Sequence, residues 1–238
     1  MTLFWYLSIA LLVLLLARLA LLAQRPTFLA AYLLSRLIQS GGLLYIGFGS
    51  NAYRKFWFVS EVISLVTLAL AVFECHLMIT REIYELGSIG KVVALVAIGL
   101  AGGAALATGA NPSVQWGPVT ALALQVKRSL LTFLTVALSA VVWFYHRFPI
   151  PVGSHVWPHT WVFIAYLAFH SVGYWGMVAL GVKLTPLLDE LLAVVWCASL
   201  AAWLWIYTRP SDPKMPPSEE ELNEANQRAR RLERTVGQ

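Results

Sequence analysis

The run LFWYLSIALLVLLLARLALLA, at positions 3–23, decides the fold class of this chain. It contains one charged residue, Arg18, and as a helix it is about long enough to cross the hydrocarbon core of a bilayer. A membrane offers no water to unpaired backbone groups, so a run of this kind is expected to be helical. Six further apolar runs follow, and together they predict an all-α, polytopic transmembrane bundle of about seven helices.

The seven predicted spans are separated by short polar segments or segments that contain Pro and Gly. They lie at 3–23, 28–48, 55–79, 89–108, 123–148, 157–181 and 186–208. Hydrophobic residues make up 59% of the 238 positions and charged residues 12%, whereas soluble domains carry about 25% charged residues. We therefore assign 1–208 to a seven-helix transmembrane domain and 209–238 to a polar C-terminal tail.

Two segments indicate protein partners or a second copy of the chain. The span at 89–108 is rich in small residues, and its Gly99 and Gly103 form a GxxxG pair that lets helices approach closely. The tail is predicted to form a short amphipathic helix with a heptad seam that includes Leu222 and Leu232. Both features also suit packing within one chain or at the membrane surface.

Basic residues predict the orientation of the chain. Arg18 comes late in the first apolar run and Arg25 follows it, which is the reverse of a cleavable signal peptide. Six of the 17 Lys and Arg residues lie in the tail, which by the positive-inside rule places the C-terminus in the cytoplasm. We expect a bacterial inner-membrane protein with its N-terminus outside and lipids around it. The formal net charge of +5 comes from these topological positions and does not indicate nucleic acid.

Ionisable residues within spans are costly and mark candidate functional positions. The candidates are Arg18, Arg36, Glu61, Glu74, His76 and His170. Arg36 and Glu74 lie at similar predicted depths on neighbouring antiparallel spans, with Arg18 and His76 near the same level. We expect a buried Arg36–Glu74 ion pair, which either fixes helix packing or handles a solute or proton.

A second group of charges is predicted near the outer face. It joins Glu61 to Lys127 and Arg128 on the fifth span and to Asp189 and Glu190 on the seventh. The charges balance well. The group forms either a rim of salt bridges or an outward-facing polar cavity.

Five histidines raise the question of a cofactor. Two histidines on different helices can hold a haem iron, and His76 with His146 or His159 lies at a suitable depth, whereas His170 lies mid-span. Histidines bonded to water or lipid headgroups are the alternative, and no metal site is predicted. His-Glu-x-x-His, Walker A and Gly-x-Ser-x-Gly motifs are absent, and the last span has no lysine for a retinal Schiff base.

Short motifs along the chain resemble those of uncharacterised seven-helix bacterial integral membrane proteins. They are Phe58-Val59-Ser60-Glu61 and Phe73-Glu74 in the third span, Lys127-Arg128 at the start of the fifth, and Trp203 to Tyr207 before the polar tail. The resemblance implies the seven-helix layout and carries no reaction, ligand or cofactor.

Three functional hypotheses follow. The first is a non-enzymatic membrane subunit or sensor that acts through protein partners. The second is a transporter of a small solute, ion or proton that uses Arg36 and Glu74, with His170. The third is a haem-binding redox protein, and it rests on the histidines alone.

Overall fold

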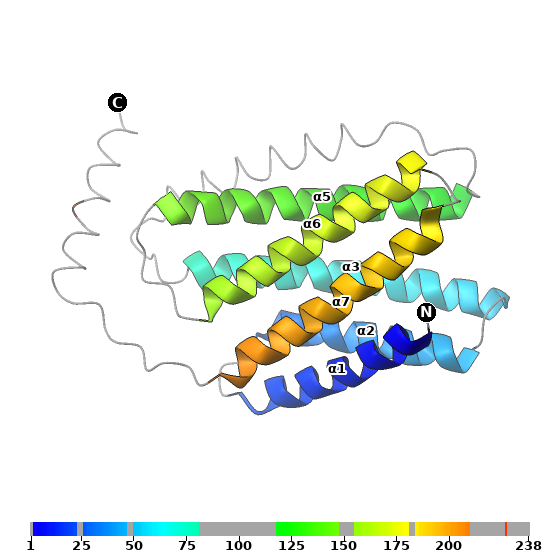
Figure 1. The fold of residues 1–238 in the computed structure, drawn as a ribbon, viewed down its shortest axis with the longest axis horizontal. Helices are drawn as coiled ribbons and strands as arrows, with labels where there is room; N and C mark the ends of the chain where they lie inside the picture. Colours follow the sequence, from blue (N-terminus) through cyan, green and yellow to red (C-terminus); the bar gives the residue numbers. More distant parts are fainter. Residues whose placement is uncertain are drawn as a thin grey trace.

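The computed structural model describes residues 2–22, 26–46, 50–80, 118–147, 155–180, 184–209 and 227. Within these ranges the regular elements are all helices (Figure 1). They are α1 (Thr2–Ala20), α2 (Thr27–Ile46), α3 (Asn51–Thr80), α5 (Pro118–Arg147), α6 (Val156–Leu180) and α7 (Thr185–Thr208). These six helices are each long and apolar enough to cross a membrane by length and composition, as in a multi-pass membrane protein.

The six helices coincide with six of the predicted spans to within a few residues. The remaining predicted span, 89–108 with Gly99 and Gly103, lies outside the described residues. So does the predicted tail helix with Leu222 and Leu232, apart from Gln227. The count of seven spans and the partner surfaces therefore stay predictions.

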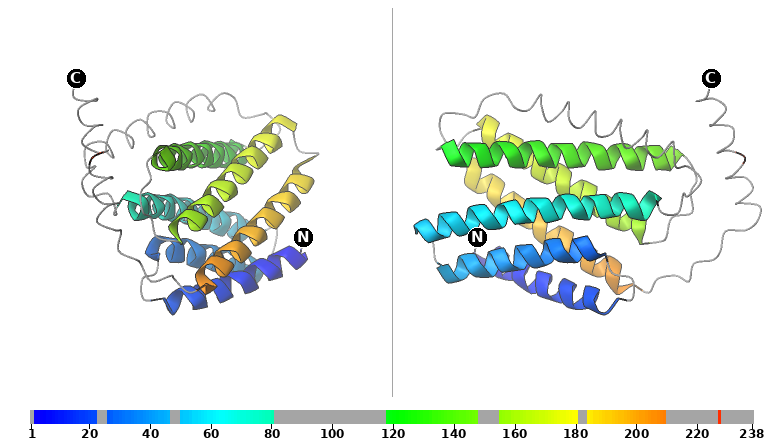
Figure 2. Two further views of the ribbon diagram at one scale, coloured as in Figure 1. Left: turned by 60° about the vertical axis from the view of Figure 1, so that its left-hand side comes forward. Right: turned by 180° about the vertical axis from the view of Figure 1, so that it is seen from behind.

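The described helices form a closed ring (Figure 2). α1 packs on α2 and α7, α3 on α2 and α5, and α6 on α5 and α7, while α3 also reaches α6 across the ring. Leucines from several helices fill the interior, among them Leu12, Leu33 and Leu167, which are fully buried. Large apolar side chains also point outward, as Val66 and Phe169 do, where the acyl chains of a bilayer would cover them.

α3 and α5 run in the same direction. Glu61 and Lys127, each in the first half of its helix, are in contact, and near the other ends Ile79 packs in one cluster with Val141 and Val142. The colour gradients of the two ribbons agree with this (Figure 1). Both helices therefore begin at one end of the bundle and finish at the other.

Candidate functional site

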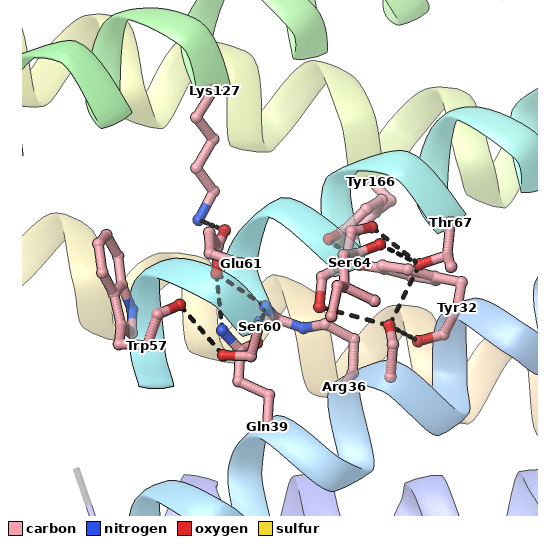
Figure 3. Close-up of polar contacts among 12 residues, drawn as sticks. Tyr32, Arg36, Gln39, Trp57, Ser60, Glu61, Ser64, Thr67, Lys127 and Tyr166 are labelled. Carbon is pink, nitrogen blue, oxygen red and sulfur yellow. Dashed lines mark hydrogen bonds and ion pairs between the residues drawn. The ribbon is translucent and has the colours of Figure 1, made fainter. Parts of the chain in front are cut away.

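A buried carboxylate, that of Glu61 on α3, holds side chains from two other helices. Its Oε1 lies 2.5 Å from the Lys127 Nζ of α5. Its Oε2 accepts a hydrogen bond of 2.9 Å from the Gln39 amide and lies 3.4 Å from Nη1 of Arg36, both on α2. Figure 3 shows the three partners converging on Glu61. Arg36 also donates to the Gln39 amide oxygen at 2.6 Å, so the polar groups form one network.

Helical periodicity brings these side chains to a common face of each helix, because positions three or four apart are neighbours on a helix. The contributing positions are Tyr32, Arg36 and Gln39 on α2, Glu61, Ser64 and Leu68 on α3, Lys127 and Leu131 on α5, and Tyr166, His170 and Tyr174 on α6. Arg36 is midway along the 20 residues of α2, about 15 Å from either end. The network therefore lies deep within the helices.

Two aromatic rings support the cations. The guanidinium carbon of Arg36 lies 5.6 Å from the ring centre of Trp196 on α7, and Nζ of Lys127 lies 4.6 Å from that of Tyr174. Cation–π contacts of this kind contribute about 0.5–2 kcal/mol, more when they are shielded from water. They partly offset the loss of hydration of each cation.

Hydroxyl groups extend the polar region along the ring interior. The hydroxyl oxygens of Tyr32 and Tyr166 are 2.6 Å apart, and both side chains are buried. Nδ1 of His170 lies 3.0 Å from the backbone carbonyl oxygen of Tyr166. Since a carbonyl only accepts, this contact assigns a proton to Nδ1 and leaves Nε2 for another partner.

A cavity of about 40 Å³ lies among these groups, between α2, α3, α5 and α6. Its lining is formed by Tyr32, Arg36, Glu61, Ser64, Leu65, Leu68, Lys127, Leu131, Tyr166, His170 and Tyr174. A cavity of this size has room for roughly three water molecules, and polar walls of this kind favour their presence. The site is thus a small polar chamber inside an apolar bundle.

The predicted Arg36–Glu74 pair is not formed. Oε2 of Glu74 instead accepts hydrogen bonds of 3.0 Å from the backbone amides of Phe28 and Leu29, at the start of α2. Arg36 lies seven residues beyond Leu29, about 10 Å further along α2. The reason is length: α3 has 30 residues and α2 has 20, so the last turns of α3 extend past the beginning of α2. Glu74 caps that helix as an N-cap side chain would.

Arg18 and His76 also lie away from the cavity. Arg18 donates from Nε to the backbone carbonyl of Tyr207 at 2.9 Å, near the end of α7. His76 is half-buried on α3, one position from the fully buried Cys75. Arg18 therefore satisfies a carbonyl at a helix C-terminus, a position that favours cations.

The predicted outer group of charges is divided in the structure. Glu61 and Lys127 are joined, but the guanidinium carbon of Arg128 lies 4.2 Å from the ring centre of Trp175 on α6. Asp189 and Glu190 are exposed and form no salt bridge with any residue in the described ranges. Arg36, for which the sequence predicts a pair with Glu74, is the second cation beside Glu61.

The haem candidates are only partly described. His159 is buried, its Nδ1 lies 2.9 Å from the hydroxyl of Tyr207, and its ring packs against Phe163 and Trp203. The side chain of His146 lies outside the described residues. Among the described residues no group of three or more His, Cys, Asp or Glu side chains is placed to hold a metal ion.

Sequence reasoning missed three features of the site: the Arg36–Glu61 contact, the Tyr32–Tyr166 hydroxyl pair and the ring of Trp196. The sequence does contain a signal for the Arg36–Glu61 contact. Arg36 lies ten residues before the end of α2, and Glu61 ten residues after the start of α3, so both lie at one depth from the connection between the two helices. Rotation of α6 and α7 decides the other two features, and no sequence pattern reports it.

Comparisons with protein-family models, with curated proteins and with solved structures give no match for this chain.

Proposed function

We propose that this protein transports a small polar solute across the membrane and that the chamber around Glu61 is its solute-binding site. The supporting observation is the polar cavity at the depth of Arg36, lined by three charged side chains and by five hydroxyl or imidazole groups from α2, α3 and α6. Ionisable groups inside spans face cavities, pair with one another and mark solute pathways. A pocket with a few convergent polar groups is the usual form of a small-molecule site.

A purely structural role for the network is the competing interpretation. A buried ion pair contributes little net stability compared with apolar residues of similar volume. In addition, packing alone does not require room for solvent between the side chains of the network. The cavity favours solute binding over packing, and it favours transport over the hypotheses of a partner-acting subunit and of a haem protein.

The proposal is tested by reconstituting the full chain into liposomes and measuring solute entry. A voltage-sensitive dye reports cation entry from sodium gluconate and anion entry from N-methyl-D-glucamine chloride, and osmotic swelling reports the entry of urea or glycine. We expect at least one solute to enter faster than into empty liposomes and Lys127→Met to abolish the difference. Lys55→Met, which removes an exposed lysine of α3, should leave it unchanged. Entry equal to that into empty liposomes for every solute would refute transport.

We further propose seven spans, with 89–108 as the one outside the described residues. The parallel course of α3 and α5 supports this, because the chain leaves one end of the bundle at Thr80 and returns at the other end at Pro118. The basic tail supports an N-terminus outside and a C-terminus in the cytoplasm of a bacterial inner-membrane protein.

A further inference from the structure

The charged groups around the cavity do not balance. Two cations, Arg36 and Lys127, line it together with one carboxylate, that of Glu61. Each oxygen of Glu61 already faces one of the cations, and a protonated His170 would only add to the positive charge. One positive charge therefore has no acidic partner among the lining residues that the structure describes.

This excess charge lies where it is costly. Arg36 is midway along α2, and an ion in a low-dielectric interior loses several kcal/mol of hydration that only a counter-charge or strong hydrogen bonds restore. Asp189 of α7 interacts electrostatically with Lys127, but it is exposed and does not line the cavity, and Glu190 is exposed as well. The rings of Trp196 and Tyr174 offset part of the cost and bring no negative charge.

The walls also hold unused hydrogen-bond donors. Within the described residues, Lys127 directs one of its three N–H groups to Glu61, and Arg36 uses those on Nη1 out of its five. In the pair formed by Tyr32 and Tyr166 one hydroxyl donates to the other, so the second hydroxyl hydrogen stays available. These donors, most of them on two cations, suit a site for an anion.

We infer that the cavity binds a small monovalent anion, of the size of a halide, nitrate or formate, between Arg36 and Lys127. A volume of about 40 Å³ has room for an ion of a few atoms. The inference rests on the proposed function, since it names the class of solute that the transport site takes. A bound anion supplies the missing negative charge and accepts the unused N–H and O–H groups.

Thermal unfolding of the full chain in an uncharged detergent tests the inference. Chloride, nitrate or formate is titrated against gluconate at constant ionic strength. Because a ligand stabilises the folded state by mass action, we expect a saturable rise in the unfolding midpoint of about 3 °C or more. Lys127→Met should weaken the apparent affinity at least about tenfold, while Lys55→Met should leave it unchanged.

A second variant keeps the test decisive if Lys127→Met fails to fold. Ser64 lines the cavity and is buried, so Ser64→Asp places a carboxylate where the anion would lie. We expect Ser64→Asp to unfold at a higher temperature than the parent chain without anion and to lose the response to chloride. A lower midpoint with the chloride response retained would overturn the inference.

Other outcomes separate the inference from the proposed function. No saturable response in the parent chain, or an equal response to gluconate, overturns the anion site. Stabilisation by phosphatidylglycerol but not by chloride also overturns it, since the negative charge would then come from a lipid. Entry of sodium, urea or glycine into liposomes without an anion response overturns the anion site and leaves transport standing. A chloride response without any solute entry supports the anion site and refutes transport.

Discussion

The Glu61 carboxylate joins three helices because each of its oxygens faces a cation from a different neighbour. Oε1 faces Lys127 of α5 and Oε2 faces Arg36 of α2. Removing one member of a buried ion pair strands the others, which costs about 3–5 kcal/mol. Glu61 is therefore the position in the network where a single substitution has the largest expected effect.

Double-mutant cycles distinguish the partner that Arg36 has in the structure from the partner predicted by sequence. We expect Arg36→Gln and Glu61→Gln to be coupled by about 0.5–3 kcal/mol, because the two side chains interact directly. Arg36→Gln and Glu74→Gln should add to within about 0.5 kcal/mol, because about 10 Å of helix separates them. Unfolding by sodium dodecyl sulfate in mixed micelles measures each free energy.

The Glu74 cycle is the matched control for the Glu61 cycle, since both remove a carboxylate from α3. Glu74→Gln alone should cost about 0.5–2 kcal/mol, the value of a lost helix cap. Strong coupling of Arg36 to Glu74, with additivity to Glu61, would contradict the arrangement described above.

At the scale of the elements, α6 and α7 approach closely where α6 carries glycine. A Cβ added at Gly173 would lie 2.7 Å from a methyl carbon of Leu192 and 3.1 Å from its Cγ. Leu192 is itself buried, so its side chain has little room to move. Trp196 follows Leu192 by one turn of α7, and the Arg36 guanidinium lies over its ring.

Gly173→Ala should therefore destabilise the protein by about 1–3 kcal/mol, the usual cost of overpacking a buried contact. Gly41→Ala is the control, because a Cβ at Gly41 meets nothing within 4 Å. Alanine favours a helix over glycine by about 0.8–1 kcal/mol, so Gly41→Ala should be neutral or stabilising. Thermal unfolding of the two variants beside the parent chain compares them, and equal losses would argue against the close approach.

Helix ends are tied to neighbouring helices in a way that local sequence does not report. The first amides of α2 donate to Glu74 of α3, and a carbonyl near the end of α7 accepts from Arg18 of α1. These contacts satisfy backbone groups that a helix leaves unpaired. They explain two of the charged residues within spans without assigning them a chemical role.

At the scale of the whole molecule, the parallel course of α3 and α5 predicts an odd number of crossings between Thr80 and Pro118. Reporter fusions test this directly. A periplasmic reporter fused after residue 50 or after residue 117 should be active, and one fused after residue 82 should be inactive. The C-terminal fusion should be inactive as well, because seven spans place the two termini on opposite sides of the membrane.

Fusion after residue 117 is the critical measurement. If the reporter after residue 117 were inactive, like the one after residue 82, the chain would cross the membrane an even number of times between Thr80 and Pro118. That result is incompatible with α3 and α5 beginning at the same end of the bundle. Inverted activity at every position would keep seven spans and reverse the orientation drawn from the positive-inside rule.

The sequence by itself determined the fold class and the positions of the six described helices, because the apolar length that a bilayer demands is a local property of the chain. It also identified Arg36, Glu61, Lys127 and His170 as polar groups that need an explanation. A one-dimensional pattern can do this, since every ionisable residue within an apolar run stands out.

Only the tertiary structure decided which of these groups meet. The partner of Arg36 depends on how far α3 extends past α2, and its contact with Trp196 depends on the rotation of α7. Packing between helices sets both the axial shift and the rotation, and neither can be predicted from the sequence of a single helix. The same packing gathers two cations and one carboxylate around a cavity, and this imbalance of charge became visible only when the six helices were placed together.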